Sequence, residues 1–251
     1  MLRLNKVSSG YDPTKQILKE IDFEISNGEI IAIMGLNGSG KSTLLRTCLG
    51  LLSPLHGEVL LNNKKLLSYT PHQRAQKISL LDSQTTIAFS MTVRELLELS
   101  ISLHGKKELF ALALEAVGLK GFEEKNLLEL SSGETRRALI AHTLCTNAEI
   151  IMIDEPFAHL DWRHQEQLAQ SLKSWNKKFN TTFVLAIHEL EWIIQIAHTV
   201  CALGKGKILA SGSPEYVFQS QLVCELFAFQ ARIDENPIDG SRRLTLGRPL
   251  K

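Results

Sequence analysis

The stretch GLNGSGKS at residues 35–42 decides the fold. It fits the pattern G-x-x-x-x-G-K-[ST], whose glycines let backbone N–H groups curl around phosphate oxygens. An apolar run at residues 30–33 precedes it, and a helical pattern follows from Lys41 to about Gly50. A loop between a strand and a helix N-terminus suits an anion, so we expect Lys41 to reach the β- and γ-phosphates and the Ser42 hydroxyl to face Mg²⁺. The segment predicts a nucleoside triphosphate site, the alternative being a chance glycine-rich turn.

Two more apolar runs, IIMI at residues 150–153 and FVLAI at residues 183–187, indicate strands. Continuous apolar runs of this length are typical of a parallel sheet covered on both faces, and ligands bind at the carboxyl ends of its strands. Asp154 and Glu155 follow the first run and His188 follows the second. An Asp there can hold Mg²⁺ and the next carboxylate can orient an attacking water. An acidic helix cap and an ordinary polar histidine are the alternatives.

The rest of the chain predicts one α/β domain with an insertion. Residues 1–33 contain short strands and a turn, and residues 57–67 read as a hairpin with Asn62-Asn63 at its tip. Residues 92–117 carry apolar side chains at helical spacing, with Thr92 as a cap, inside a helical subdomain at approximately residues 85–145. We expect the domain to span residues 1–232, followed by a loosely packed extension at residues 233–251, which is rich in Pro, Gly and Arg.

Composition narrows the class of protein. The chain has 28 basic and 27 acidic residues, a balance that argues against a dedicated nucleic-acid binder. Its four cysteines show no CxxC spacing, and apolar neighbours favour buried thiols in a reducing cytosol over disulfides. The apolar runs are far shorter than the roughly 20 residues of a spanning helix, and the N-terminus lacks the apolar region of a signal peptide. We therefore expect any membrane role to arise by association.

The motif LSSGE at residues 130–134 precedes a predicted helix. A Ser hydroxyl and exposed Gly amides at a helix N-terminus suit a phosphate, although a plain Ser/Gly helix cap is the alternative. With this motif the chain resembles the ABC ATPase family over nearly its whole length. The family signature is commonly written LSGGQ, so Ser132 replaces a Gly and Glu134 replaces a Gln. In that family the signature contacts the ATP of the opposite subunit, which implies that two copies, or paired ATPase subunits, complete the sites.

The resemblance implies a P-loop NTPase (RecA-like) core with a mostly parallel sheet, an N-terminal antiparallel β-subdomain and a helical insertion. It also implies roles for individual residues: Tyr11 stacks on adenine, His188 contacts the γ-phosphate, and Asp161 communicates across the dimer. The implied ATP-binding residues are Tyr11, Gly35, Asn37, Gly38, Ser39, Gly40, Lys41, Ser42 and Thr43; the catalytic residues are Lys41, Glu155 and His188; the Mg²⁺ ligands are Ser42, Gln84 and Asp154; and the signature is Ser131, Ser132, Gly133 and Glu134.

The glutamine among the Mg²⁺ ligands departs from the family pattern. In the family it commonly follows a Leu-Pro pair, whereas Leu80-Leu81 here leads to Asp82, Ser83 and Gln84. Counting back from Thr92-Val93 places the glutamine position at Ser83. The assignment to Gln84 therefore requires an adjustment of one residue.

The resemblance implies an ATP-hydrolysing subunit of an ABC importer, with ATP and Mg²⁺ as cofactors. Its partners would be a separate membrane permease and, indirectly, a substrate-binding protein, with no nucleic acid, at the cytoplasmic face of the inner membrane. PHQRAQKI at residues 71–78 and EPFAHLD at residues 155–161 are similar to the iron-siderophore, haem and cobalamin uptake group. A non-transport ABC ATPase, an exporter subunit, a stand-alone P-loop kinase or GTPase, and a subunit that binds ATP without hydrolysing it are the alternatives.

Overall fold

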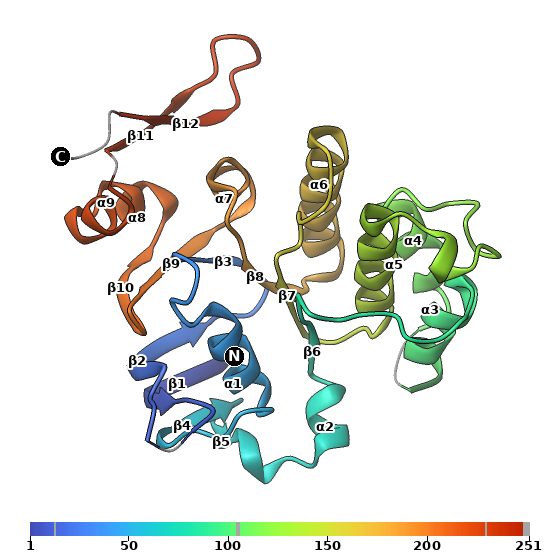
Figure 1. Cartoon of the computed structure of the whole chain (residues 1–251), viewed down its shortest axis with the longest axis horizontal. Coiled ribbons are helices and arrows are strands. Elements are labelled where there is room, and N and C mark those ends of the chain that lie inside the picture. Colours follow the sequence, from blue (N-terminus) through green and yellow to red (C-terminus); the bar gives the residue numbers. More distant parts are fainter. Residues whose placement is uncertain (13, 104–105, 229, 248–251) are drawn as a thin grey trace.

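A mostly parallel sheet with strand order β10-β9-β3-β8-β7-β6 forms the centre of the chain (Figure 1). The computed structural model describes residues 1–12, 14–103, 106–228 and 230–247. Every residue of β3, β7 and β8 is buried, as their continuous apolar sequences predict. All pairs are parallel except β9 with β10. The strands are β3 (Ile30–Met34), β6 (Ile78–Leu81), β7 (Ile150–Asp154), β8 (Thr182–Ala186), β9 (Thr199–Gly204) and β10 (Lys207–Gly212).

An antiparallel sheet with strand order β2-β1-β4-β5 forms the N-terminal part, as predicted. Its strands are β1 (Leu2–Ser9), β2 (Leu18–Ile25), β4 (His56–Leu61) and β5 (Lys64–Lys65). Asn62 and Asn63 join β4 to β5 with φ of 49° and 61°, the left-handed pair that a tight type I′ hairpin turn requires. Helix α1 (Lys41–Leu49) buries Leu44 and Leu45 in an apolar cluster that includes residues of both sheets.

The predicted helical insertion is present, but its first helical pattern is divided. Residues 92–117 hold α3 (Val93–Leu103) and α4 (Leu109–Ala116), both packed against α5 (Ser132–Cys145). Thr92 caps α3 as predicted, because Glu95 N–H donates to its Oγ1 at 3.1 Å. Figure 1 shows α3, α4 and α5 gathered beyond the β6 edge of the central sheet. Shorter elements are the helix α2 (Pro71–Ala75) and the 3-10 turns Leu66–Ser68 and Leu127–Glu129.

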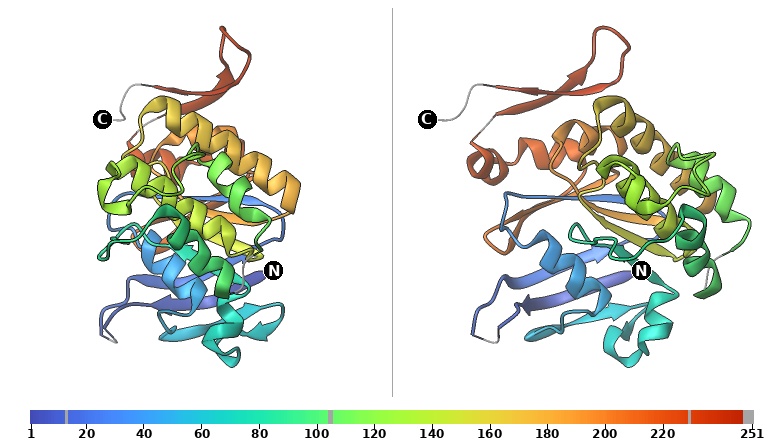
Figure 2. Two further views of the ribbon diagram at one scale, coloured as in Figure 1. Left: turned by 90° about the vertical axis from the view of Figure 1, so that its right-hand side faces the viewer. Right: turned by 45° about the vertical axis from the view of Figure 1, so that its right-hand side comes forward.

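The C-terminal part is more ordered than the sequence suggests. Residues 231–246 form an antiparallel hairpin in which Ile233 lies opposite Leu244, and both side chains pack against the main apolar cluster. The predicted boundary between residues 232 and 233 therefore falls inside a strand. Figures 1 and 2 show this hairpin projecting from the end of the molecule next to α7 and α8. The elements are α6 (Trp162–Phe179), α7 (Leu190–Ile196), α8 (Pro214–Gln219), α9 (Gln221–Phe227), β11 (Ala231–Glu235) and β12 (Arg242–Leu246).

Two expectations from composition can be compared with the structure. No helix within residues 1–12, 14–103, 106–228 and 230–247 has the length and apolar character of a membrane span. Cys48, Cys145 and Cys201 are buried free thiols, as predicted, and Cys224 is half-buried.

Candidate nucleotide-binding site

The phosphate-binding loop connects β3 to α1. Gly40 has a φ of 108°, and a Cβ atom there would lie 2.9 Å from Leu18 Cδ2, so this position favours glycine. Lys41 folds back over the loop, and its Nζ donates to the carbonyl oxygens of Gly35 at 2.9 Å and Leu36 at 3.3 Å. Burial lowers the pKa of Lys41, while the carboxylates of Asp154 and Glu155 oppose this shift. An ammonium group held by neutral carbonyls in this way is available to phosphate oxygens.

The remaining predicted loop residues fall into two groups. Asn37 and Gly38 are exposed at the tip of the loop, whereas Ser39 and Thr43 are buried. Among the described residues, Ser39 Oγ has no hydrogen-bond partner. Tyr11 is exposed, and its hydroxyl accepts a hydrogen bond from Arg46 Nη1 of α1 at 2.7 Å. The predicted adenine-stacking residue is thus tethered to the helix that follows the loop.

Asp154 lies at the carboxyl end of β7 and is only 2% exposed. Its Oδ2 accepts hydrogen bonds from Ser42 Oγ at 2.6 Å and from Ser83 Oγ at 3.1 Å. Within the described chain, its Oδ1 is buried and has no hydrogen-bond partner. A carboxylate with a spare oxygen beside two hydroxyls is the hard-oxygen set that Mg²⁺ prefers, so these residues fit that cation.

Ser83, and not Gln84, is the residue that the structure brings to Asp154. Gln84 is exposed, and its backbone N–H donates to Asp82 Oδ1 at 3.1 Å. Counting back from Thr92-Val93 was the sequence signal that pointed to Ser83.

The predicted catalytic pair lies together at the ends of neighbouring strands. His188 Nε2 is 3.3 Å from Glu155 Oε1, and both side chains are partly exposed. Glu155 has a φ of 55°, in the left-handed region that residues other than Gly rarely adopt. Its backbone N–H donates to Ala186 O at 2.9 Å, which ties the turn after β7 to the end of β8. This arrangement aims a carboxylate and an imidazole at the same region of solvent.

Sequence reasoning missed Arg136, a 7% exposed residue of α5. Its Nη2 donates to the carbonyl oxygens of Asp154 and, at 3.1 Å, Glu155. Its Nη1 lies 3.4 Å from the carbonyl oxygen of Asp82. Burial lowers the pKa of Arg136, an effect that the carboxylates of Asp154 and Glu155 oppose. The available signal was a pair of arginines directly before the apolar run ALIA at residues 138–141.

The signature forms the N-terminus of α5. Ser131 caps the helix by accepting from Glu134 N–H at 3.2 Å, and Glu134 Oε2 in return accepts from Ser131 N–H at 2.8 Å and Ser131 Oγ at 2.7 Å. These bonds to the Ser131 hydroxyl and N–H lower the pKa of Glu134. A Cβ atom on Gly133 would lie 2.8 Å from His159 O, so glycine permits the close approach of α5 to the segment after β7. The helix-cap reading is therefore correct as local structure.

A pocket of about 240 Å³ joins the signature to the segment that contains Asp161. Asp161 caps α6 by accepting from His164 N–H at 2.9 Å, which fixes the wall of this pocket. Its lining includes Ser131, Ser132, Gly133, Glu134, His159, Leu160, Asp161 and His164. The phosphate loop lies elsewhere, between β3 and α1, so the two predicted contact regions for ATP are separate within one copy of the chain.

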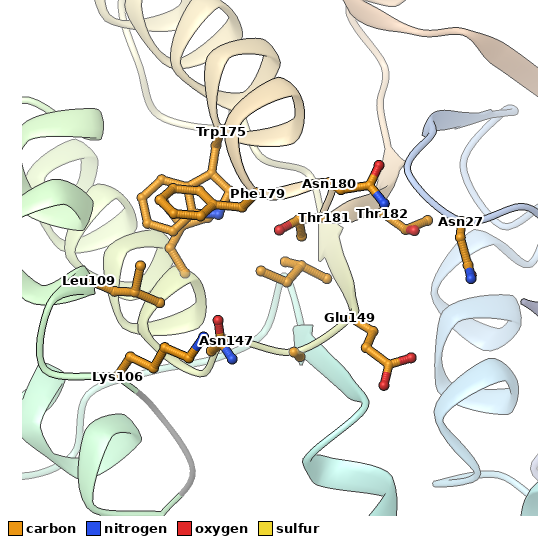
Figure 3. A pocket seen from close by; sticks show the side chains of 13 residues that line it. Asn27, Lys106, Leu109, Asn147, Glu149, Trp175, Phe179, Asn180, Thr181 and Thr182 are labelled. Carbon is orange, nitrogen blue, oxygen red and sulfur yellow. The ribbon is translucent and has the colours of Figure 1, made fainter.

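A cavity of about 430 Å³ lies apart from these residues (Figure 3). It is lined by Thr182 at the start of β8 and by Ile151 near the start of β7, at the amino ends of the strands. The rings of Trp175 and Phe179 lie beside one another at its side, with centroids 4.7 Å apart. The nucleotide-binding residues occupy the opposite, carboxyl ends of the strands.

Known proteins are similar to this chain in sequence. Residues 18–158 match the family model described as ABC transporter. The chain is 33% identical to the petrobactin import ATP-binding protein FpuD of Bacillus anthracis, over 90% of this chain and 86% of that protein. It is 30% identical to the ferric enterobactin transport ATP-binding protein FepC of Escherichia coli (strain K12), over 96% of this chain and 92% of that protein.

A solved structure is similar to this chain in fold. The dimeric post-hydrolysis state of an ATP-binding cassette bound to ADP and Pi is 28% identical, with a TM-score of 0.77, and the match covers 85% of this chain and 99% of that one. The family model covers more than half of the chain, and the curated relatives match over most of it. The chain therefore belongs to the ABC transporter family, as one of its ATP-binding and ATP-hydrolysing subunits.

Proposed function

We propose that this subunit powers an importer by pairing with a second copy and driving a separate membrane permease at the cytoplasmic face of the membrane. The observation that carries the proposal is the meeting of the phosphate loop, Asp154 and the Glu155–His188 pair at the carboxyl ends of β3, β7 and β8. The transport roles in the names of FpuD and FepC support an iron-siderophore or similar metal chelate as cargo.

The chemistry follows from what each side chain can do. Lys41 exchanges the carbonyl oxygens of Gly35 and Leu36 for phosphate oxygens, which places its charge where negative charge develops. Glu155 orients the attacking water for in-line displacement, and His188 steadies that carboxylate at 3.3 Å. Ser42 and Asp154 would hold Mg²⁺, which when bound neutralises charge on the β- and γ-phosphates.

Pairing of two copies follows from the separation of the partial sites. The pocket at the N-terminus of α5 is lined by Ser131, Ser132 and Gly133, and no residue of the phosphate loop of its own chain is among its described lining residues. Such a helix terminus binds an anion. We propose that it meets the γ-phosphate held by the second copy, so that ATP favours the closed pair and the products release it.

This subunit has a surface suited to contact with the permease. Two adjoining hollows of about 290 and 310 Å³ share Ser79, Leu80 and His142, between the central sheet and the helical insertion. Exposed apolar side chains line them: Leu51 is 69% exposed and Phe89 is 74% exposed. An apolar patch rimmed by polar residues marks a protein interaction site. We propose that the permease docks here, and that a substrate-binding protein acts only through the permease.

The variant Glu155→Gln tests the proposal. It keeps the size of the side chain but removes the charge that orients water, so we expect ATP binding and ATP-dependent dimerisation with turnover reduced by about 10² or more. Glu149→Gln, at the other end of β7, serves as the control and should turn over normally. Unchanged turnover of Glu155→Gln would contradict the assignment.

The transport role needs its own measurement. A tagged Glu155→Gln chain should retain a polytopic permease when purified from detergent-solubilised membranes of its native host, with partners identified by mass spectrometry. The identity of that permease would define the cargo. Recovery of soluble partners alone, from membranes that contain intact transporters, would favour a non-transport ABC ATPase.

A further inference from the structure

The Asp154 carboxylate receives a second hydroxyl, from Ser83, which is not among the Mg²⁺ ligands Ser42, Gln84 and Asp154 that the resemblance implies. Ser42 Oγ and Ser83 Oγ both donate to Oδ2 of Asp154, at 2.6 and 3.1 Å. Oδ1 of the same carboxylate is buried and, among the residues described, has no partner. A buried, half-satisfied carboxylate is destabilising unless a further group completes its interactions. Two hydroxyls and a spare carboxylate oxygen thus lie close together, and oxygens of these kinds are suited to a divalent cation.

The backbone next to Ser83 is anchored through the side chain of Asp82. Asp82 Oδ2 accepts from Arg46 Nε of α1 at 2.7 Å, and burial of this pair is substantial, with both side chains less than 25% exposed. Gln84 N–H closes the turn on Asp82 Oδ1 at 3.1 Å. These bonds hold the turn in which the Ser83 hydroxyl donates to Asp154 Oδ2, and both Ser83 and Gln84 are exposed.

We propose that Ser83 Oγ is an oxygen ligand of the Mg²⁺ held by Ser42 and Asp154, in the role that the sequence suggested for Gln84. This inference rests on the proposed function. A serine hydroxyl can keep donating its hydrogen to the carboxylate while a lone pair faces the cation, as Ser42 would. A hydroxyl is shorter than a glutamine amide, so the loop at residues 82–84 must stay close to Asp154 for the contact to persist.

Metal binding by the full-length chain tests this without relying on hydrolysis. The probe is Mn²⁺ in the presence of saturating ADP. The electron paramagnetic resonance signal of free Mn²⁺ measures Mn²⁺ binding, and displacement of bound Mn²⁺ by Mg²⁺ measures Mg²⁺ binding. We expect Ser83→Ala to raise the apparent Kd of the metal about tenfold, the size of effect that loss of one ligand-orienting contact typically has. The matched variant Gln84→Ala should stay within about twofold, since among the described residues only the backbone of Gln84, and not its side chain, makes a hydrogen bond near the site.

A change of metal preference in a Ser83 variant would support the proposal by a gain of binding. Ser83→Cys replaces a hard oxygen with a soft sulfur, so it should weaken Mg²⁺ as Ser83→Ala does and bind Cd²⁺ more tightly than the unmodified chain. ADP binding in EDTA should be the same in all four proteins, which controls for folding.

The possible outcomes distinguish failure of the Ser83 assignment from failure of the proposed function. A tenfold effect confined to Ser83→Ala, with the Cd²⁺ switch, supports the proposal. An effect confined to Gln84→Ala, or no effect of either variant while Asp154→Asn abolishes metal binding, overturns the Ser83 assignment and leaves the proposed function intact. Failure of the unmodified chain to bind metal–ADP at all would overturn the proposed function itself.

Discussion

Replacing Arg136 with Met should damage both folding and turnover, because this side chain joins α5 to the turn that carries Glu155. Two hydrogen bonds from a charged donor would be lost, to Asp154 O and Glu155 O, while the longer 3.4 Å approach to Asp82 O adds little. Methionine fills a similar volume, so the change tests the bonds more than the packing.

The magnitude follows from these contacts. Hydrogen bonds to charged groups contribute about 1.5–3 kcal/mol each, and a buried carbonyl that loses its donor adds to the loss. Removing a buried guanidinium also removes its desolvation penalty, which offsets part of this sum. We expect the free energy of unfolding to fall by about 2–4 kcal/mol, which for a chain of this size lowers Tm by about 5–15 °C. Because Glu155 sits at a left-handed φ that its neighbours must hold, we also expect kcat to fall by about 10².

The assay has a matched control in the next residue. Arg137 is also 7% exposed, and its Nη1 donates to the carbonyl oxygens of Val117 at 3.0 Å and Gly118 at 3.3 Å. These acceptors lie after α4, away from β7. Arg137→Met should therefore lose a similar unfolding free energy in urea but keep a kcat at least tenfold above that of Arg136→Met, measured well below both melting temperatures. Equal kcat values for the two variants would refute the positioning role.

Two further predictions concern pH and thiol chemistry. Burial lowers the pKa of His142 from 6.5, although its hydrogen bond to the carbonyl oxygen of Leu96 opposes this shift. The neutral imidazole therefore stabilises the fold fully above pH 6.5, and this stabilisation is lost as pH falls through the lower pKa of the folded chain. In urea unfolding, the free energy of unfolding should fall more between pH 7.5 and 5.5 in the unmodified chain than in His142→Gln. Burial raises the pKa of Cys48, Cys145 and Cys201 to about 12. A colorimetric thiol reagent should therefore label Cys224 first in the native chain. Equal labelling rates for all four thiols would contradict the fold.

The elements that could be predicted from sequence are those encoded by neighbouring residues. The phosphate loop, the strands that end at Asp154 and before His188, and the β4–β5 hairpin depend on short apolar runs and turn residues, and the structure confirms them. The strand ends then brought Glu155 and His188 together, because neighbouring parallel strands end at one edge of the sheet.

The features that escaped prediction depend on contacts between distant segments. Arg136 meets the end of β7 from α5, and no local pattern of the sequence specifies that contact. The break between α3 and α4 and the start of β11 at Ala231 were missed for a related reason: packing against α5, α7 and α8 decides them.

The central place of β3 has a consequence for how this chain is made. The strand that delivers the phosphate loop pairs with β8 and β9, and Ile30 N–H donates to His198 Nδ1, 168 residues further along. During synthesis from the N-terminus, both edges of β3 therefore remain unpaired until residues 182–204 have left the ribosome. Long-range parallel pairing is slow and leaves apolar strand edges open to aggregation. Nascent chains that stop short of β8 would thus depend on chaperones, and the nucleotide site would be one of the last parts of the fold to form.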